Sequence, residues 1–122
     1  MHELSIAMSI VEGASEEAER HSGGKVSVVH LLLGRLSGVV KEALLFSYDI
    51  ATEGTDLEGS VLEIEDIDAA IFCRQCDAER TLDSIQNFAC PVCGTPTSEV
   101  VRGRELLIKS LELTDEYAAA TG

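Results

Sequence analysis

The sequence is short of aromatic residues and has no long apolar run, and both shortages limit what the chain can be. Aromatic residues make up 4% of the 122 residues while 45% are hydrophobic, so an aliphatic core is expected, with one main domain and a small second module. No apolar run approaches the roughly 20 residues of a membrane span. No secretory signal with a basic flank and a long apolar stretch follows Met1, so a cytoplasmic protein without membrane contact is expected.

Basic residues are also scarce. Nine Lys and Arg residues stand against 22 Asp and Glu residues, which gives a formal net charge of −13. A field of this sign repels phosphate backbones and attracts cations. Nucleic acid is therefore not an expected partner.

The hydrophobic pattern predicts two helices and three longer strands. A helix is expected from Glu3 to about His21, and a second helix after Ser37, which would serve as its N-cap. Strands are expected within 25–38, where the apolar pattern suggests cover on both faces, and within 60–67 and 104–113. The buried face of the first helix is predicted to carry Leu4, Met8, Val11, Ala14 and Ala18.

These elements predict an α+β fold, with two helices on a small mixed β-sheet and an inserted four-cysteine, zinc-ribbon-like module. The main domain is expected to comprise residues 1–66 and 100–114, with the module at 67–99 and a poorly anchored tail at 115–122. The last strand needs a sheet to join, and the simplest arrangement places it beside the strand at 60–67. Both a monomer and a dimer are compatible with this pattern.

All four cysteines lie in the module, as two Cys-x-x-Cys pairs: Cys73 with Cys76, and Cys90 with Cys93. Each pair can form a tight turn that aims two sulfur atoms at one point, so four soft ligands can surround a Zn(II) ion. Gly94 allows the left-handed conformation that such turns often need, whereas Asp77, at the matching place after the first pair, adopts it less readily.

Three alternatives to zinc stay open for these cysteines. Iron in a rubredoxin-type site would use the same ligands, because ligand type alone does not separate the two metals. Two disulfides are unexpected in a cytoplasmic chain. A thioredoxin-like dithiol would explain one pair and leave the other without a role.

The first residues, Met-His-Glu-Leu-Ser, form a second candidate metal site. The free amine of Met1, the next amide nitrogen and the imidazole of His2 can form two adjacent chelate rings. Such a planar, nitrogen-rich set suits Ni(II) or Cu(II) and not tetrahedral Zn(II). If a helix begins near Glu3, its first backbone N–H groups have no intrahelical partner and are available to the metal. The alternative is that His2 is merely an exposed second residue.

The chain is similar to the HypA/HybF family of hydrogenase nickel incorporation proteins. The resemblance rests on the opening MHELSIA, the segment from Gly34 to Asp66, the two cysteine pairs and the closing GRELLIKSLEL, and it covers nearly the whole chain. It implies a nickel metallochaperone for [NiFe] hydrogenase maturation that is not an enzyme. Two partners are implied: a nickel-binding GTPase accessory protein and the hydrogenase large-subunit precursor.

The resemblance also assigns roles to residues. It makes His2 the essential Ni(II) ligand, assisted by the Met1 amine and by the backbone nitrogens of His2 and Glu3. Glu42 is the counterpart of a carboxylate that supports the nickel site in some relatives. Zn(II) would be structural, with the ligands Cys73, Cys76, Cys90 and Cys93. A zinc-ribbon adaptor that binds protein without handling nickel remains the alternative, and His21 and His30 match no ligand of the family.

Overall fold

The structure is a computed structural model that describes residues 3–21, 24–84 and 87–114. Within these residues no helix combines the length and the apolar character that crossing a membrane requires. The chain divides into two compact units. The first consists of Met1–Leu31, Val39–Ile64 and Ile108–Gly122, and the second of Leu32–Gly38 and Glu65–Leu107.

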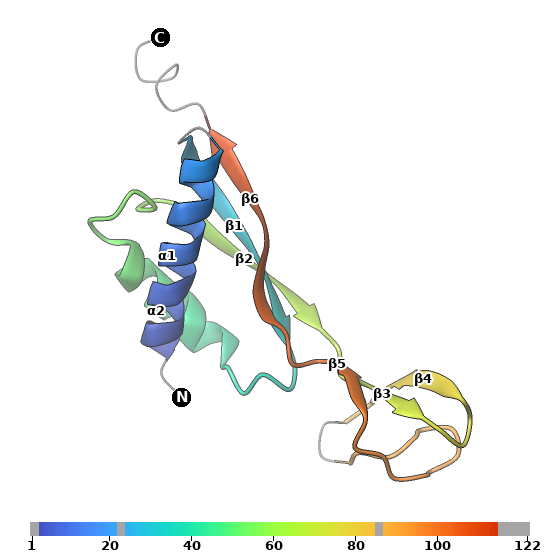
Figure 1. Ribbon diagram of the computed structural model, residues 1–122. Helices are drawn as coiled ribbons and strands as arrows, with labels where there is room; N and C mark the ends of the chain where they lie inside the picture. The colour runs from blue at the N-terminus through green and yellow to red at the C-terminus, as the bar shows by residue number, and fades with distance from the viewer. Residues whose placement is uncertain (1–2, 22–23, 85–86, 115–122) are drawn as a thin grey trace. The chain divides into compact units, whose positions relative to one another are not determined.

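The first unit is built from two helices and most of a three-stranded sheet. The helices α1 and α2 span Glu3–Arg20 and Lys41–Thr52, and the strands β1, β2 and β6 span Lys25–Gly34, Val61–Ile67 and Leu106–Thr114. The strand order is β2-β1-β6, and Figure 1 shows β1 and β2 pointing the same way while β6 points the opposite way. The predicted two helices and mixed sheet are therefore confirmed.

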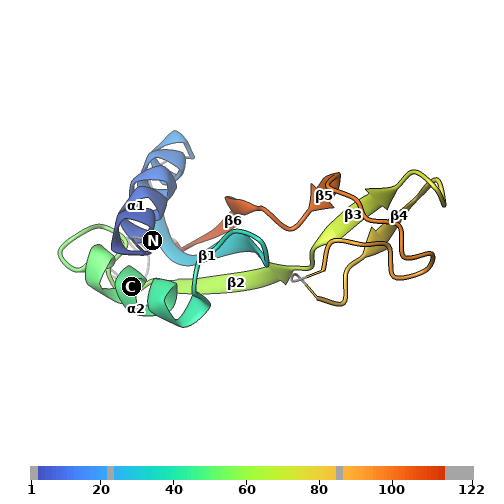
Figure 2. The same cartoon turned by 90° about the horizontal axis from the view of Figure 1, so that it is seen from below.

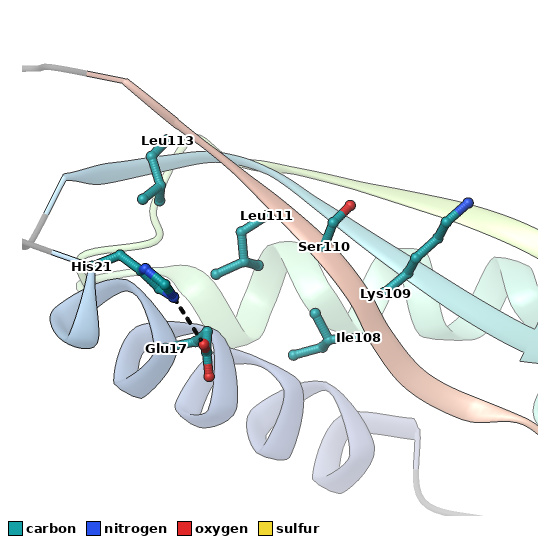
Figure 3. Close-up of a pocket in the computed structure, with 7 residues that line it drawn as sticks. All are labelled: Glu17, His21, Ile108, Lys109, Ser110, Leu111 and Leu113. Atoms are coloured by element: carbon teal, nitrogen blue, oxygen red, sulfur yellow. Dashed lines mark hydrogen bonds and ion pairs between the residues drawn. The ribbon is translucent and has the colours of Figure 1, made fainter.

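The helices cover one side of this sheet (Figure 3). In β1, Val29, Leu31 and Leu33 are buried, whereas His30, which points to the opposite side, is half-buried. Val28, His30 and Leu32 are half-buried and not exposed, so the expected cover on both faces is partial, and the central position of β1 is as predicted.

The buried face of α1 differs in part from the predicted face. Val11, Ala14 and Ala18 are buried as expected, but Leu4 and Met8 are 43% and 58% exposed. Ala7 and Ile10 take their place in the core, so the buried stripe is rotated toward smaller side chains. Both stripes satisfy helical spacing, and the close approach of α1 to its neighbours favours the one with alanines.

The last strand does not lie where the sequence suggested. β6 pairs with β1 and not with β2, so β1 is the central strand and β2 and β6 are the two edges of the sheet. The segment before β6 is held there by backbone bonds: the Gly34 amide donates to the Glu105 carbonyl over 2.8 Å, and the Leu36 amide to the Gly103 carbonyl over 2.6 Å.

Ser37 is not the N-cap of the second helix. α2 begins at Lys41, and the cap position is held by Val40, which makes no side-chain capping bond. The chain at Gly34–Ser37 is committed to a turn instead, in which the Ser37 amide donates to the Gly34 carbonyl. The helix therefore starts only after this turn.

The second unit contains an antiparallel sheet of three short strands, β4-β3-β5, which lie together in Figure 2. The strands β3, β4 and β5 span Ala70–Cys73, Ala78–Thr81 and Val100–Arg102. In the hairpin of β3 and β4, Ile71 faces Arg80 and Cys73 faces Ala78. The small core beside this sheet consists of Ala69, Ile71, Cys73, Leu82 and Cys90, with Leu36, Cys76, Phe88 and Val100 packed against it.

Candidate metal centres

The structure brings the four cysteines together. Cys73 ends β3, Cys76 lies in the turn before β4, and Cys90 and Cys93 lie in the loop before β5. Their sulfur atoms all lie within 4.8 Å of one another. All four are free thiols, with 3.5 Å between the sulfurs of Cys73 and Cys93, so no disulfide is formed. Four thiols converging on one point are the donor set of a tetrahedral zinc or iron site.

Both cysteine pairs form tight turns of similar conformation. Asp77 and Gly94, each one residue beyond the second cysteine of its pair, have positive φ angles of 54° and 80°. Gly94 adopts this conformation at no steric cost, and Asp77 is a residue type that tolerates it. The Cys76 amide donates to the Cys73 sulfur over 3.4 Å, and the Gly94 amide to the Cys90 carbonyl over 2.8 Å. Local backbone hydrogen bonds thus help to position the sulfurs of both pairs.

These local bonds give the thiols different acidities. Donation from the backbone N–H groups of Cys93 and then Val92 lowers the pKa of Cys90 to about 6. Hydrogen bonding with Thr95, whose Oγ1 lies 3.1 Å from the sulfur, lowers the pKa of Cys93. In contrast, hydrogen bonding with the Cys93 sulfur raises the pKa of Cys76 to about 11. Cys90 is therefore a thiolate near neutral pH and a ready first ligand for a metal.

One arginine lies against the cysteines, and the sequence analysis missed it. A hydrogen bond with Cys76, assisted by Cys90, raises the pKa of Arg80. Its Nε atom is buried and has no hydrogen-bond partner among the residues that the structure describes. A half-buried cationic group beside thiols fits a centre whose metal-bound thiolates carry excess negative charge. The strand Ala-Glu-Arg-Thr gave no signal for this role, because only the hairpin register reveals which side Arg80 faces.

The second candidate centre is described only from Glu3 onward, because Met1 and His2 lie outside the described residues, as does the predicted tail at 115–122. Glu3 is the first residue of α1, as expected. Its carboxylate accepts a hydrogen bond from the Val40 amide over 3.5 Å. The starts of the two helices therefore lie side by side, and the exposed Glu42 is in the first turn of α2.

The other two histidines each lie beside carboxylates. His21 lies 3.2 Å from Glu17 beside a groove of about 530 Å³ between α1 and β6 (Figure 3). On β1, His30 Nε2 is 2.6 Å from Glu112 and its Nδ1 is 3.6 Å from Glu63. Because its two ring nitrogens face carboxylates on β2 and β6, His30 links the three strands of the sheet.

Comparison with known proteins identifies a family. The sequence profile described as "Hydrogenase/urease nickel incorporation, metallochaperone, hypA" matches residues 1–113. The hydrogenase maturation factor HypA of Roseiflexus sp. (strain RS-1) is 47% identical over 121 residues, which are 99% of this chain and 98% of the relative. That of Chloroflexus aurantiacus is 48% identical over 112 residues, which are 92% of this chain and 98% of the relative.

Solved structures support the fold. The solution structure of the Ni metallochaperone HypA from Helicobacter pylori superposes with a TM-score of 0.68 at 22% identity, covering 93% of this chain and 97% of the other. A second solution structure of a HypA protein gives a TM-score of 0.70 at 22% identity, covering 94% and 98%. At this identity the likeness concerns the fold alone.

Proposed function

The chain belongs to the HypA family, whose members are hydrogenase/urease nickel incorporation metallochaperones and not enzymes, and from this premise we propose that it binds Ni(II) at its N-terminus and delivers it for [NiFe] hydrogenase maturation. The observation that carries the proposal is the start of α1 at Glu3. The first amide nitrogens of a helix have no intrahelical acceptor, so a metal can replace their protons without breaking the helix.

We assign the nickel ligands as the His2 imidazole, the Met1 amine and the backbone nitrogens of His2 and Glu3. All of these donors are nitrogen atoms, a donor type that suits Ni(II). The positive end of the helix dipole opposes a cation, but the deprotonated amides and the Glu3 carboxylate offset it. Cu(II) binds such nitrogen sites more tightly than Ni(II), so copper competes in vitro and selectivity depends on metal supply and partner docking.

Glu42 is assigned a supporting role. The bond between Glu3 and Val40 joins the starts of the two helices, and Glu42 lies two residues after Val40. Its exposed carboxylate can therefore accept a hydrogen bond from a ligand at the N-terminus and orient it.

The four cysteines are assigned as a structural Zn(II) site. A closed set of four thiolates leaves no open coordination position, so the ion folds the module and takes no part in transfer. Iron would use the same ligands, and metal analysis of the purified protein distinguishes the two. In this division of roles, residues 1–66 with 100–114 handle nickel and residues 67–99 hold zinc.

The proposed partners are a nickel-binding GTPase accessory protein, which exchanges nickel with this chain, and the hydrogenase large-subunit precursor, which receives it. The net charge of −13 favours docking to basic surfaces and gives encounter rates that fall with salt. We propose the cytoplasm as the compartment, because its reducing conditions keep the four thiols free for metal.

The test is a calorimetric Ni(II) titration of the zinc-loaded, untagged protein, comparing wild type with His2→Ala and with His21→Ala as the matched control. His21 is an exposed histidine paired only with Glu17 among its described neighbours, so its loss leaves the proposed ligands intact. We expect about one Ni(II) per chain for wild type and the control, and none at this site for His2→Ala, with zinc retained in all three. Equal binding by His2→Ala would instead favour a zinc-ribbon adaptor.

A further inference from the structure

Arg80 lies on the side of the second unit's sheet that faces the cysteines. In the antiparallel hairpin, residues opposite each other share a face, and Arg80 is opposite Ile71. Ile71 and Cys73 are both fully buried, and they belong to the small core that also contains Cys90. A charged side chain on the core face of a sheet needs a partner of opposite charge.

No carboxylate supplies that partner among the described residues. The neighbouring arginines have their own partners, because Arg74 pairs with Glu99 and Arg102 with Glu79. Both of these pairs are solvent-exposed, whereas the Nε of Arg80 is buried without an acceptor. Hydrogen bonding with Cys76 and Cys90 raises the pKa of Arg80, and the sulfurs of these two cysteines, which belong to different pairs, lie 3.9 Å apart.

We propose that Arg80 is a positioning residue of the four-cysteine centre: its guanidinium spans Cys76 and Cys90 and stabilises the negative charge of their metal-bound thiolates. The inference rests on the proposed metal site and adds a determinant of how firmly that site retains its ion. Four thiolates carry more negative charge than one divalent ion neutralises, and the excess is costly in a partly buried site.

The choice of arginine follows from geometry. A guanidinium presents a planar fork of N–H donors and is always protonated, so it can donate to two sulfurs at once. A lysine at the same place would supply the charge as a single point and would meet both sulfurs less well. The Arg80 side chain on β4 thus neutralises negative charge in both cysteine turns at once.

The experiment compares zinc retention in wild type, Arg80→Gln, Arg80→Lys and the control Arg74→Gln, using a chromophoric chelator as competitor. We expect Arg80→Gln to weaken zinc binding about 10-fold or more, the range seen when groups that contact metal ligands are removed. Arg80→Lys should fall between this variant and wild type, and Arg74→Gln should match wild type, because Arg74 is exposed and paired elsewhere. Unchanged zinc binding in Arg80→Gln would overturn the inference.

Substitution of Co(II) for zinc provides a second measurement, the absorption spectrum of the bound cobalt. This spectrum would not change if Arg80 had a purely structural role. Removing a positive charge near the sulfurs raises the energy of their donor electrons, so the sulfur-to-cobalt charge-transfer band of Arg80→Gln should shift to longer wavelength. If Arg80→Gln does not fold, the Lys variant decides: retention of zinc with the charge kept supports the inference, and failure of both variants indicates a packing role and overturns it. Failure of wild type to hold any metal would instead refute the four-cysteine site itself.

Discussion

The carboxylate of Glu3 accepts a hydrogen bond from the backbone amide of Val40 and so joins the first turn of α1 to the start of α2 over 3.5 Å. Val40 occupies the N-cap position of α2 without a capping side chain of its own, so Glu3 serves one of the helix's otherwise unpaired N–H groups from outside the helix. The negative carboxylate also lies at the positive end of the α2 dipole. The side chain of Glu3 thus accepts a hydrogen bond from α2, while its backbone nitrogen is the group assigned as a nickel ligand.

Replacing Glu3 therefore tests the capping role of its side chain separately from the nickel-binding role of its backbone nitrogen. We expect Glu3→Ala to lower the free energy of unfolding by about 0.5–1 kcal/mol, the usual cost of a lost cap, while Ni(II) affinity changes little because the backbone donor remains. Urea denaturation and nickel titration measure the two quantities. Loss of nickel binding with unchanged stability would show that the carboxylate itself is a ligand.

The acidities of the thiols predict how many protons leave when zinc binds. Near neutral pH, Cys90 with its pKa of about 6 is already a thiolate, whereas Cys76 with its pKa of about 11 still carries a proton. Fewer than four protons should therefore be released per zinc, and the number should rise, with falling affinity, as pH drops through about 6 and Cys90 becomes protonated. Calorimetry in buffers of different ionisation enthalpy counts the protons. Release of all four near neutral pH contradicts the assignment of Cys90.

A buried hydrogen bond fastens α2 to the loop before β2. The Tyr48 hydroxyl lies 2.6 Å from Ser60 Oγ, which donates in turn to the Leu57 carbonyl over 2.6 Å. Tyr48→Phe and Ser60→Ala should each cost about 1 kcal/mol of stability, as is typical for one hydrogen bond. In a double-mutant cycle by urea denaturation, the second change should add less than the first. Fully additive losses would show that the two groups are not coupled.

Alanine substitutions at two glycines should change the stability of the protein in opposite directions. A Cβ atom on Gly34 would lie 2.1 Å from the Gly103 carbonyl oxygen, so Gly34→Ala must displace backbone and should destabilise the protein by about 1–3 kcal/mol. In α1, a Cβ on Gly13 meets Ile108 Cδ1 at an ordinary 3.7 Å, and Gly13→Ala should stabilise the helix by about 0.5–1 kcal/mol. Thermal unfolding of the two variants measures the changes. A stabilised Gly34→Ala would refute the close approach of the two chain segments.

The sequence predicted the helices, strands and turns themselves better than it predicted which of them lie side by side. Cys-x-x-Cys spacing fixes two tight turns locally, which is why the cluster of sulfurs and the left-handed conformation at Gly94 could be foreseen. Asp77 adopts the same conformation, although the sequence indicated that it would do so less readily. The start of α1 at Glu3 followed from local pattern in the same way.

The wrong predictions concern features that depend on contacts with residues distant in the sequence. Leu4 and Met8 fit a helical stripe as well as Ala7 and Ile10 do, and only packing against other elements selects between the stripes. Ser37 has the right chemistry for an N-cap, but backbone bonds to Gly103 and within the turn commit its segment elsewhere. Likewise, β6 could join either edge of the sheet by its own pattern, and the role of Arg80 required the register of the hairpin.

The most direct test of the central claim is a nickel K-edge X-ray absorption spectrum of the untagged, zinc-loaded protein carrying one equivalent of Ni(II). We expect nitrogen and oxygen neighbours only, with the multiple-scattering pattern of one imidazole, and loss of that pattern in His2→Ala. Sulfur neighbours around nickel would place the ion among the four cysteines and would contradict the assignment of the N-terminus as the nickel site.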